Sequence, residues 1–125
     1  MAKYYTLVPL PQGAFEKLSL VDRAVFGLLW ERYRLSSYKV TGGDERWYDP
    51  EWQEIYCVYA LDELVRQVGV SDKTIRRSLI ALRDAGMIYW RKASYAGANR
   101  YYFDHSIRSE MSALRQDSRL EQLCL

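Results

Sequence analysis

Apolar residues recur three or four positions apart between Ser19 and Leu35, which is the spacing of one face of a helix. The stripe runs through Val21, Val25, Leu28, Leu29 and Arg32, flanked by Phe26 and Trp30. Ser19 can cap such a helix, and Asp22 puts a negative charge in its first turn. We therefore expect a first helix that runs to about Tyr33 or Leu35.

Two further helices are predicted on either side of a short turn. Residues 61–68 present one apolar face, and Gly69 marks the end of that helix. After Val70, Ser71 can cap a second helix over residues 72–85, with Gly86 at its carboxyl end. This order of segments predicts a helix-turn-helix. The apolar face of its first helix consists of Leu61, Leu64, Val65 and Val68.

Segments with the composition of β-strands lie before and after these helices in the sequence. Residues 4–11 form an extended arm, and residues 54–59, 87–92 and 100–103 are predicted strands. The last two strands are joined by residues 93–99, in which Gly97 and Asn99 supply turn chemistry. Residues 36–53 are rich in turn residues but carry Trp47, Tyr48 and Trp52, so we expect an ordered loop or hairpin whose rings cover the core or a partner.

Together these elements predict an α+β fold, a winged helix-turn-helix with an extended amino-terminal arm and a two-stranded wing. We expect residues 1–105 to form the domain. Residues 106–125 are expected to be a polar carboxy-terminal tail, either the start of a linker or a truncated end. This tail is weakly amphipathic through Ile107, Met111 and Leu114.

Composition narrows the functional classes. A chain of 125 residues with 49% hydrophobic residues is expected to be one domain with a real core. It has no apolar run long enough for a membrane span and no signal-peptide pattern, and Cys57 and Cys124 are expected to be free thiols in a reducing bacterial cytoplasm. One histidine and the absence of CxxC, HExxH and P-loop patterns predict no metal, no cofactor and no enzyme.

Charge is unevenly distributed. Between Ser71 and Phe103 the chain carries seven basic and two acidic residues, a net charge of +5, whereas the whole chain carries +2. A local basic surface on a helix-turn-helix is typical of proteins that bind duplex DNA. The basic residues are Lys73, Arg76, Arg77, Arg83, Arg91, Lys92 and Arg100.

A helical wheel separates packing from charge in residues 72–85. Ile75, Ser78, Leu79 and Leu82 share one face, and the far face carries Lys73, Arg77, Ile80 and Asp84. The alternative is that the basic residues merely solvate an exposed helix. Two features favour DNA: the basic residues lack matching acids four positions away, and Ile80 lies among them, where a base methyl or a partner subunit would be met.

The predicted DNA-contacting residues follow from this separation. Lys73 and Arg77 are candidates for guanine edges, and Thr74 or Ile80 for a thymine methyl group, with Arg76 beside them. Ser71, with the amides of its helix, is placed for a phosphate. The wing would contact the DNA backbone or minor groove, unless it is only an exposed hairpin with charged edges. Its candidate residues are Arg91, Lys92, Tyr95 and Arg100.

Other groupings are weaker candidates for a site. Acidic residues in residues 51–63 have no base, nucleophile or metal ligand beside them, and we interpret them as surface and helix-start charges. His105 is expected to be a surface residue at a strand end. The aromatic residues 47–59 could stack bases as single-strand binders do, but packing of the amino-terminal arm is the favoured interpretation. The acidic residues are Glu51, Glu54, Asp62 and Glu63.

The order of segments resembles the amino-terminal domain of RepA-type plasmid replication initiators. The resemblance rests on the arm YYTLVPLPQGAF (4–15), the helix LSLVDRAVFGLLWERYRLSSYK (18–39), residues 47–88, and the return strand from Asn99 to Tyr102. It implies binding to repeated double-stranded DNA sites in a replication origin, and a homodimer formed through the arm. Host replication proteins would be partners only if a carboxy-terminal domain exists.

Two other classes remain open on the sequence. One is a transcriptional regulator with the same winged-helix fold. The other is a protein-interaction module whose basic helix binds an acidic partner.

Overall fold

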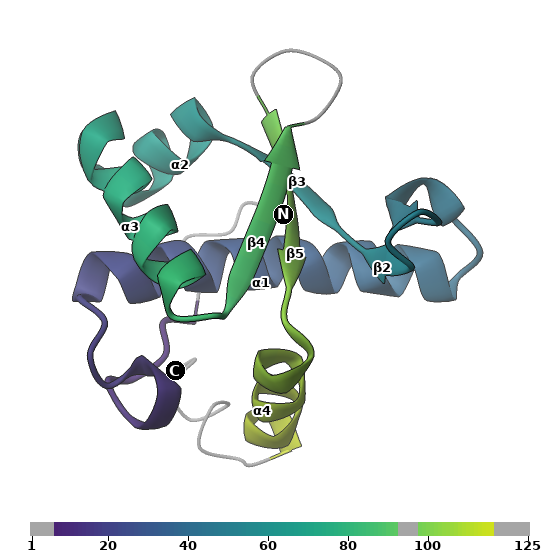
Figure 1. The fold of residues 1–125 in the computed structure, drawn as a ribbon, viewed down its shortest axis with the longest axis horizontal. Helices are drawn as coiled ribbons and strands as arrows, with labels where there is room; N and C mark the ends of the chain where they lie inside the picture. The colour runs from purple at the N-terminus through teal and green to yellow at the C-terminus, as the bar shows by residue number, and fades with distance from the viewer. Residues whose placement is uncertain (1–6, 93–97, 117–125) are drawn as a thin grey trace.

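The computed structural model describes residues 7–92 and 98–116. Within these residues, two short 3-10 helices, η1 and η2, accompany four α-helices and five strands (Figure 1). Figure 1 shows α1 crossing the molecule behind the strands, with α2 and α3 at one end and the β1–β2 hairpin at the other. In chain order the elements are η1 (Gly13–Phe15), α1 (Leu20–Thr41), η2 (Glu45–Trp47), β1 (Tyr48–Asp49), β2 (Glu54–Ile55), β3 (Cys57–Ala60), α2 (Leu61–Val68), α3 (Asp72–Asp84), β4 (Ile88–Lys92), β5 (Ala98–Phe103) and α4 (His105–Gln116).

Helix α1 begins as predicted but ends later. The Ser19 hydroxyl accepts a hydrogen bond from the Asp22 amide, and the Asp22 carboxylate accepts one from the Ser19 amide, which is a complete capping box. The predicted end near Tyr33 or Leu35 is wrong. Serine weakens a helix only slightly, and Ser36 is buried here, so the helix continues until it reaches the glycine pair at 42–43. Phe26, predicted beside the buried stripe, lies fully inside it.

The helix pair α2–α3 forms as predicted. Gly69 ends α2 in the left-handed conformation, with φ of 82°. The Ser71 hydroxyl accepts a hydrogen bond from the Thr74 amide and caps α3. Both helices pack on α1, so the pair is held at one end of that helix.

The wing belongs to a three-stranded antiparallel sheet in the order β3-β5-β4. β5 pairs with both neighbours, and Asn99 is opposite Tyr59 on one side and Lys92 on the other. Asn99 is therefore a strand residue, and the predicted turn role is wrong for it, because two partner strands satisfy its backbone. Gly97 lies outside the described residues.

Residues 48–55 form a hairpin, which was one of the two alternatives predicted for residues 36–53. Within the described residues, the aromatic rings of this segment contact rings of β4, β5 and Tyr56. Trp52 lies 4.7 Å from Tyr102 and 5.6 Å from Tyr89 between ring centroids, and Trp47 lies 6.2 Å from Tyr56. Strand pairing brings the rings of β4 and β5 against them. Residues 4–6 of the arm lie outside the described residues, so the expected packing against the arm stays a prediction.

The described part of the amino-terminal arm lies against α1. The Arg23 guanidinium donates a hydrogen bond to the Pro9 carbonyl at 3.0 Å. Gly27, one turn further, has no side chain, and a Cβ at this position would collide with the Leu7 carbonyl oxygen. The absence of a side chain therefore allows the arm backbone to touch the helix.

Helix α4 was not expected. Ile107 and Met111 are 3% and 6% exposed, and both belong to the main hydrophobic core. Residues 105–113 therefore pack on the domain, and the expected polar tail is wrong for this part of residues 106–125. The few apolar side chains of this weakly amphipathic segment are enough to hold it as a helix, because α1 and β5 offer an apolar surface on which they pack. The core also contains Phe15, Val25, Phe26, Leu29, Tyr33, Leu64, Ile75, Leu79, Leu82, Ile88, Tyr101 and Phe103.

Candidate nucleic-acid interface

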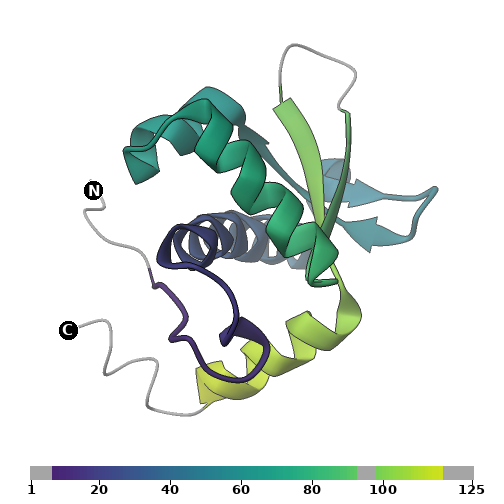
Figure 2. The same cartoon turned by 60° about the vertical axis from the view of Figure 1, so that its left-hand side comes forward.

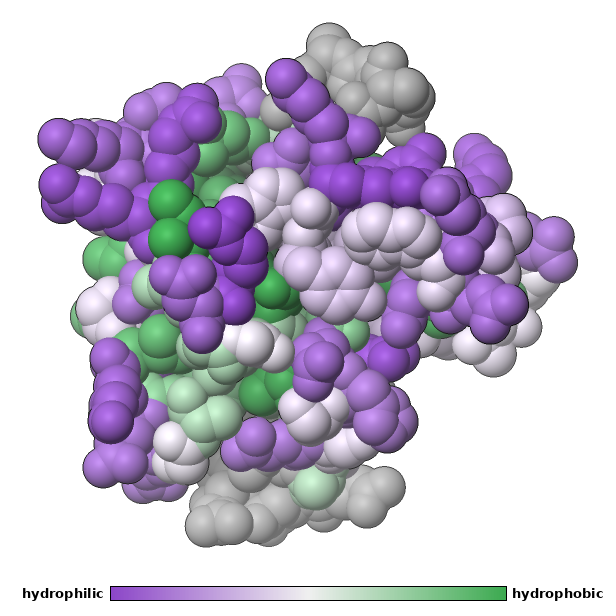
Figure 3. All heavy atoms as spheres, in the orientation of Figure 1, coloured by the Kyte–Doolittle hydropathy of each residue, from purple (hydrophilic) through white to green (hydrophobic). Residues whose placement is uncertain are grey.

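Helix α3 presents a basic face outward. Ile75, Ser78, Leu79 and Leu82 are at most 4% exposed, as the helical wheel predicts. Ile80 is 43% exposed on the opposite side. Figure 3 shows hydrophilic side chains projecting at the end of the molecule that α2 and α3 form. The exposed basic residues of this face are Lys73, Arg76 and Arg77, with Thr74 partly exposed beside them.

The charges on α3 are partly paired. Arg76 Nε lies 3.4 Å from Asp72 Oδ2, four positions away, which corrects the expectation that no acid matches the basic residues. Both side chains are more than half exposed, so this ion pair contributes little to stability and can exchange for another anion. Among the described acidic residues, none forms an ion pair with Lys73 or Arg77.

Ser71 stands at the amino end of α3. Its hydroxyl lies 3.0 Å from the Thr74 hydroxyl and caps the helix. Both residues are thereby held at the helix terminus, where backbone N–H groups and the helix dipole favour an anion. Asp72, in the first turn of α3, is a competing negative charge there.

The wing residues divide between the two faces of the sheet. Side chains alternate along a strand, so Lys92 lies on the same face as Trp90, the face that meets α3. Arg91 and Arg100 are opposite each other in the register and lie on the other face. Lys92 is exposed and thus joins the α3 surface, whereas Arg91 and Arg100 do not. Tyr95 lies outside the described residues.

Both wing arginines make contacts within the protein. The Arg100 guanidinium lies 4.5 Å from the centre of the Tyr56 ring. Arg91 donates to Asp49 at 2.5 Å and to the Tyr102 hydroxyl at 3.1 Å, and it forms an ion pair with Glu51 at 3.3 Å.

One contact that the sequence did not indicate joins the two predicted DNA-binding elements. The Arg83 guanidinium lies 5.0 Å from the centre of the Trp90 ring, so α3 rests against β4. Only a basic residue late in α3 and a tryptophan in the next strand could have suggested it.

Cys57, in β3, is a buried free thiol. Burial raises the pKa of the Cys57 thiol to about 12, which keeps it protonated and unreactive. No group of three His, Cys, Asp or Glu side chains in residues 7–92 and 98–113 is arranged to hold a metal ion. In the same part of the chain, no helix has the length and apolar character needed to cross a membrane.

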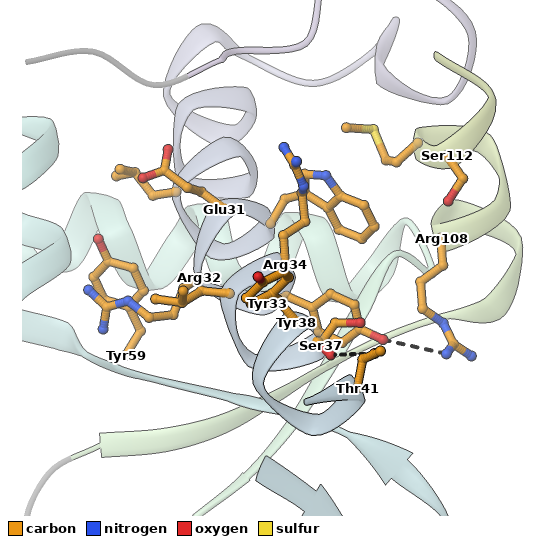
Figure 4. Close-up of a pocket in the computed structure, with 14 residues that line it drawn as sticks. Glu31, Arg32, Tyr33, Arg34, Ser37, Tyr38, Thr41, Tyr59, Arg108 and Ser112 are labelled. Atoms are coloured by element: carbon orange, nitrogen blue, oxygen red, sulfur yellow. Dashed lines mark hydrogen bonds between the residues drawn. The ribbon is translucent and has the colours of Figure 1, made fainter. Parts of the chain in front are cut away.

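An open pocket of about 810 Å³ lies between α1 and α4 (Figure 4). At one end, Arg108 Nη1 lies 3.5 Å from the Tyr33 hydroxyl and 3.4 Å from Glu54 Oε2. None of the residues that line it belongs to α3, β4 or β5, so it is separate from the basic surface.

Known structures share this fold. No protein-family model matches the chain, and no curated protein matches it in sequence. Two solved structures, described as "N-Terminal domain of DNA binding protein" and "Structure of Rep-DNA complex", have TM-scores of 0.57 and are 16% identical, covering 82% of this chain and 75% of theirs. A third, "Structure of MDR initiator", has a TM-score of 0.56 at 16% identity and covers 90% of both chains. The predicted α+β winged-helix fold is confirmed.

Proposed function

We propose that this chain binds duplex DNA sequence-specifically as the DNA-binding domain of a replication initiator, at the origin of a plasmid or mobile element. The observation that carries the proposal is the exposed basic face of α3, with Ile80 at its centre, on a winged helix. The solved structures of the same fold include a Rep–DNA complex and an initiator, which supports DNA as the partner.

Helix α3 would enter the major groove with its exposed face. Arg77 and Lys73 would donate to guanine O6 and N7, and Ile80 or Thr74 would contact a thymine methyl group. Arg76 would exchange its exposed partner Asp72 for a phosphate, because a surface ion pair of this kind is weak. Ser71 and the first amides of α3 would bind a second phosphate.

The wing would add a contact that carries no sequence information. Lys92 is the basic wing residue on the α3 side of the sheet, and we assign it to the DNA backbone. Origin repeats would be bound by a homodimer joined through the amino-terminal arm, in the bacterial cytoplasm.

Substitution of Arg77 tests the groove assignment. Arg77→Ala should cost about 1–3 kcal/mol at one base position and relax the sequence preference there. Lys92→Ala should weaken binding to every sequence alike and reduce the salt slope by about one. The measurement is fluorescence anisotropy with duplexes selected from a random pool, and Lys17→Ala, an exposed lysine outside this surface, is the matched control. Unchanged affinity and preference in Arg77→Ala would refute the groove assignment.

The same selection separates the other two classes. Tandem repeats among the selected duplexes support an initiator, whereas a single palindromic operator supports a transcriptional regulator. A module that binds an acidic protein would show no steep dependence of duplex binding on salt.

A further inference from the structure

A buried carboxylate links the hairpin to the wing. Asp49, in β1, is 2% exposed. Its Oδ2 atom accepts a hydrogen bond from the Tyr102 hydroxyl at 2.7 Å and one from Arg91 Nη2 at 2.5 Å. The other carboxylate oxygen accepts from the amides of Glu51 and Trp52. Asp49 therefore fixes the hairpin turn and both wing strands at once.

Aromatic rings enclose this contact. Tyr89 and Tyr102 stack across β4 and β5 with centroids 5.2 Å apart and an interplanar angle of 4°. Trp52 covers Tyr102 and also lies 4.8 Å below the Arg91 guanidinium. Arg91 thus contacts Asp49, Tyr102 and Trp52, and its side chain is 30% exposed.

The wing is held from its other face as well. Figure 2 shows α3 and the β1–β2 hairpin on opposite sides of the wing strands. On the α3 side, Arg83 rests on Trp90, and on the hairpin side Arg91 rests on Trp52. The adjacent residues Trp90 and Arg91 therefore fix the orientation of β4 relative to both neighbours.

We propose that Asp49, Arg91 and Tyr102 form a wing clamp, which orients β4 and β5 relative to α3, and that Arg91 is a positioning residue and not a DNA contact. The clamp rests on the proposed function, because its purpose is to present Lys92 beside the α3 surface. A phosphate could take Arg91 only by leaving Asp49 buried without its cation, which a protein interior strongly disfavours.

Removing the negative charge of Asp49 tests the wing clamp, because the clamp and simple electrostatics predict opposite changes in DNA affinity. If electrostatics alone acted, Asp49→Asn would tighten binding to DNA, because it removes a negative charge near the wing. The wing clamp predicts the reverse: affinity for a mixed-sequence duplex falls about tenfold, equivalent to about 1.4 kcal/mol, with an unchanged salt slope. Arg91→Ala should show the same pattern, whereas loss of a phosphate contact would reduce the slope by about 0.9.

Glu51→Gln is the matched control. Its carboxylate also pairs with Arg91 but is 73% exposed, so its removal should leave affinity unchanged or slightly higher. Tyr102→Phe keeps the ring and removes the hydroxyl, and it should weaken binding as Asp49→Asn does. It serves as the deciding variant if Asp49→Asn fails to fold by circular dichroism.

Hydrogen exchange tests the wing clamp without DNA. In Asp49→Asn or Tyr102→Phe, the amides of β4 and β5 should exchange faster, while those of α1 keep their protection. If the unmodified chain binds no duplex DNA, the proposed function is refuted. Hydrogen exchange alone then tests the wing clamp. The clamp is wrong if the wing amides keep their protection, or if Asp49→Asn binds DNA as tightly as the unmodified chain or more tightly.

Discussion

Ser71 caps α3 and stands at the helix terminus to which we assign a phosphate. Its hydroxyl caps α3 by accepting from the Thr74 amide, and we assign the same helix terminus to a phosphate. Aspartate caps a helix about as well as serine does but carries a negative charge. The two roles can therefore be separated by the choice of substituent.

Ser71→Asp should keep the stability of the domain and weaken its binding to DNA. We expect a free energy of unfolding within about 0.5 kcal/mol of the unmodified chain, because the cap is preserved. Ser71→Ala should lose about 1 kcal/mol of stability, because the cap is removed. Urea unfolding and anisotropy with duplex DNA measure both effects. Equal DNA affinity for Ser71→Asp and the unmodified chain would place the terminus of α3 away from any phosphate.

At the scale of single residues, the sequence predicted correctly those residues whose contacts lie within a few positions along the chain. Ser71, Gly69 and the two faces of α3 follow from positions within a few residues, and the structure has them as expected. The burial of Asp49 could not be predicted in this way, because an aspartate before a proline is typical of an exposed turn. Its burial depends on Tyr102, which lies 53 positions further along the chain.

Among the elements, the β1–β2 hairpin carries a buried carboxylate whose pKa is lowered by its partners. Burial alone would raise the pKa of Asp49, but the Tyr102 hydroxyl, the Trp52 and Glu51 amides and the charge of Arg91 together hold that pKa below its usual range. A carboxyl group whose pKa is lowered on folding stabilises the folded state above its unfolded pKa. That stability is lost as the pH falls through the lower, folded pKa.

We therefore expect acid to loosen the hairpin through Asp49. The free energy of unfolding should stay level from neutral pH to about pH 4, the unfolded pKa of aspartate, and fall below it. Asp49→Asn should be less stable at neutral pH and lose part of this acid dependence. Urea unfolding at a series of pH values measures it, with Glu51→Gln as the exposed comparison. An identical pH profile for Asp49→Asn would show that the carboxylate carries no such stability.

Element boundaries were predicted less well than element identity. The end of α1 was placed too early because the serine pair after Leu35 suggested a stop, whereas the glycines at 42–43 provide it. Helix α4 was missed because its apolar residues are sparse, and only the surface of α1 and β5 makes them sufficient. Tertiary packing outweighs local preference in both elements.

Over the whole molecule, α4 completes the core on the side away from the α2–α3 pair. Ile107 and Met111 join the cluster that contains Tyr33 and Phe103. Arg108, between them, pairs with Glu54 and so connects α4 to the hairpin. The packed core therefore extends past residue 105.

Ile107→Ala should destabilise the entire domain by about 2–4 kcal/mol, because it leaves a cavity in a packed core. Ser109→Ala, at an exposed position of the same helix, is the matched control and should change stability by less than about 0.5 kcal/mol. Urea unfolding followed by both circular dichroism and tryptophan fluorescence measures the change. If the two variants are equally stable, α4 is not part of the cooperative core.

The passage of the arm over Gly27 constrains how this protein can diverge. The contact is made by a main-chain carbonyl, so it places no demand on which side chain stands at position 7. Position 27, in contrast, can accept no side chain while the arm stays where it is. Relatives that dock their arm in this way should keep glycine at this helix position while residue 7 drifts. A relative with alanine there is expected to carry its arm along a different path over the helix.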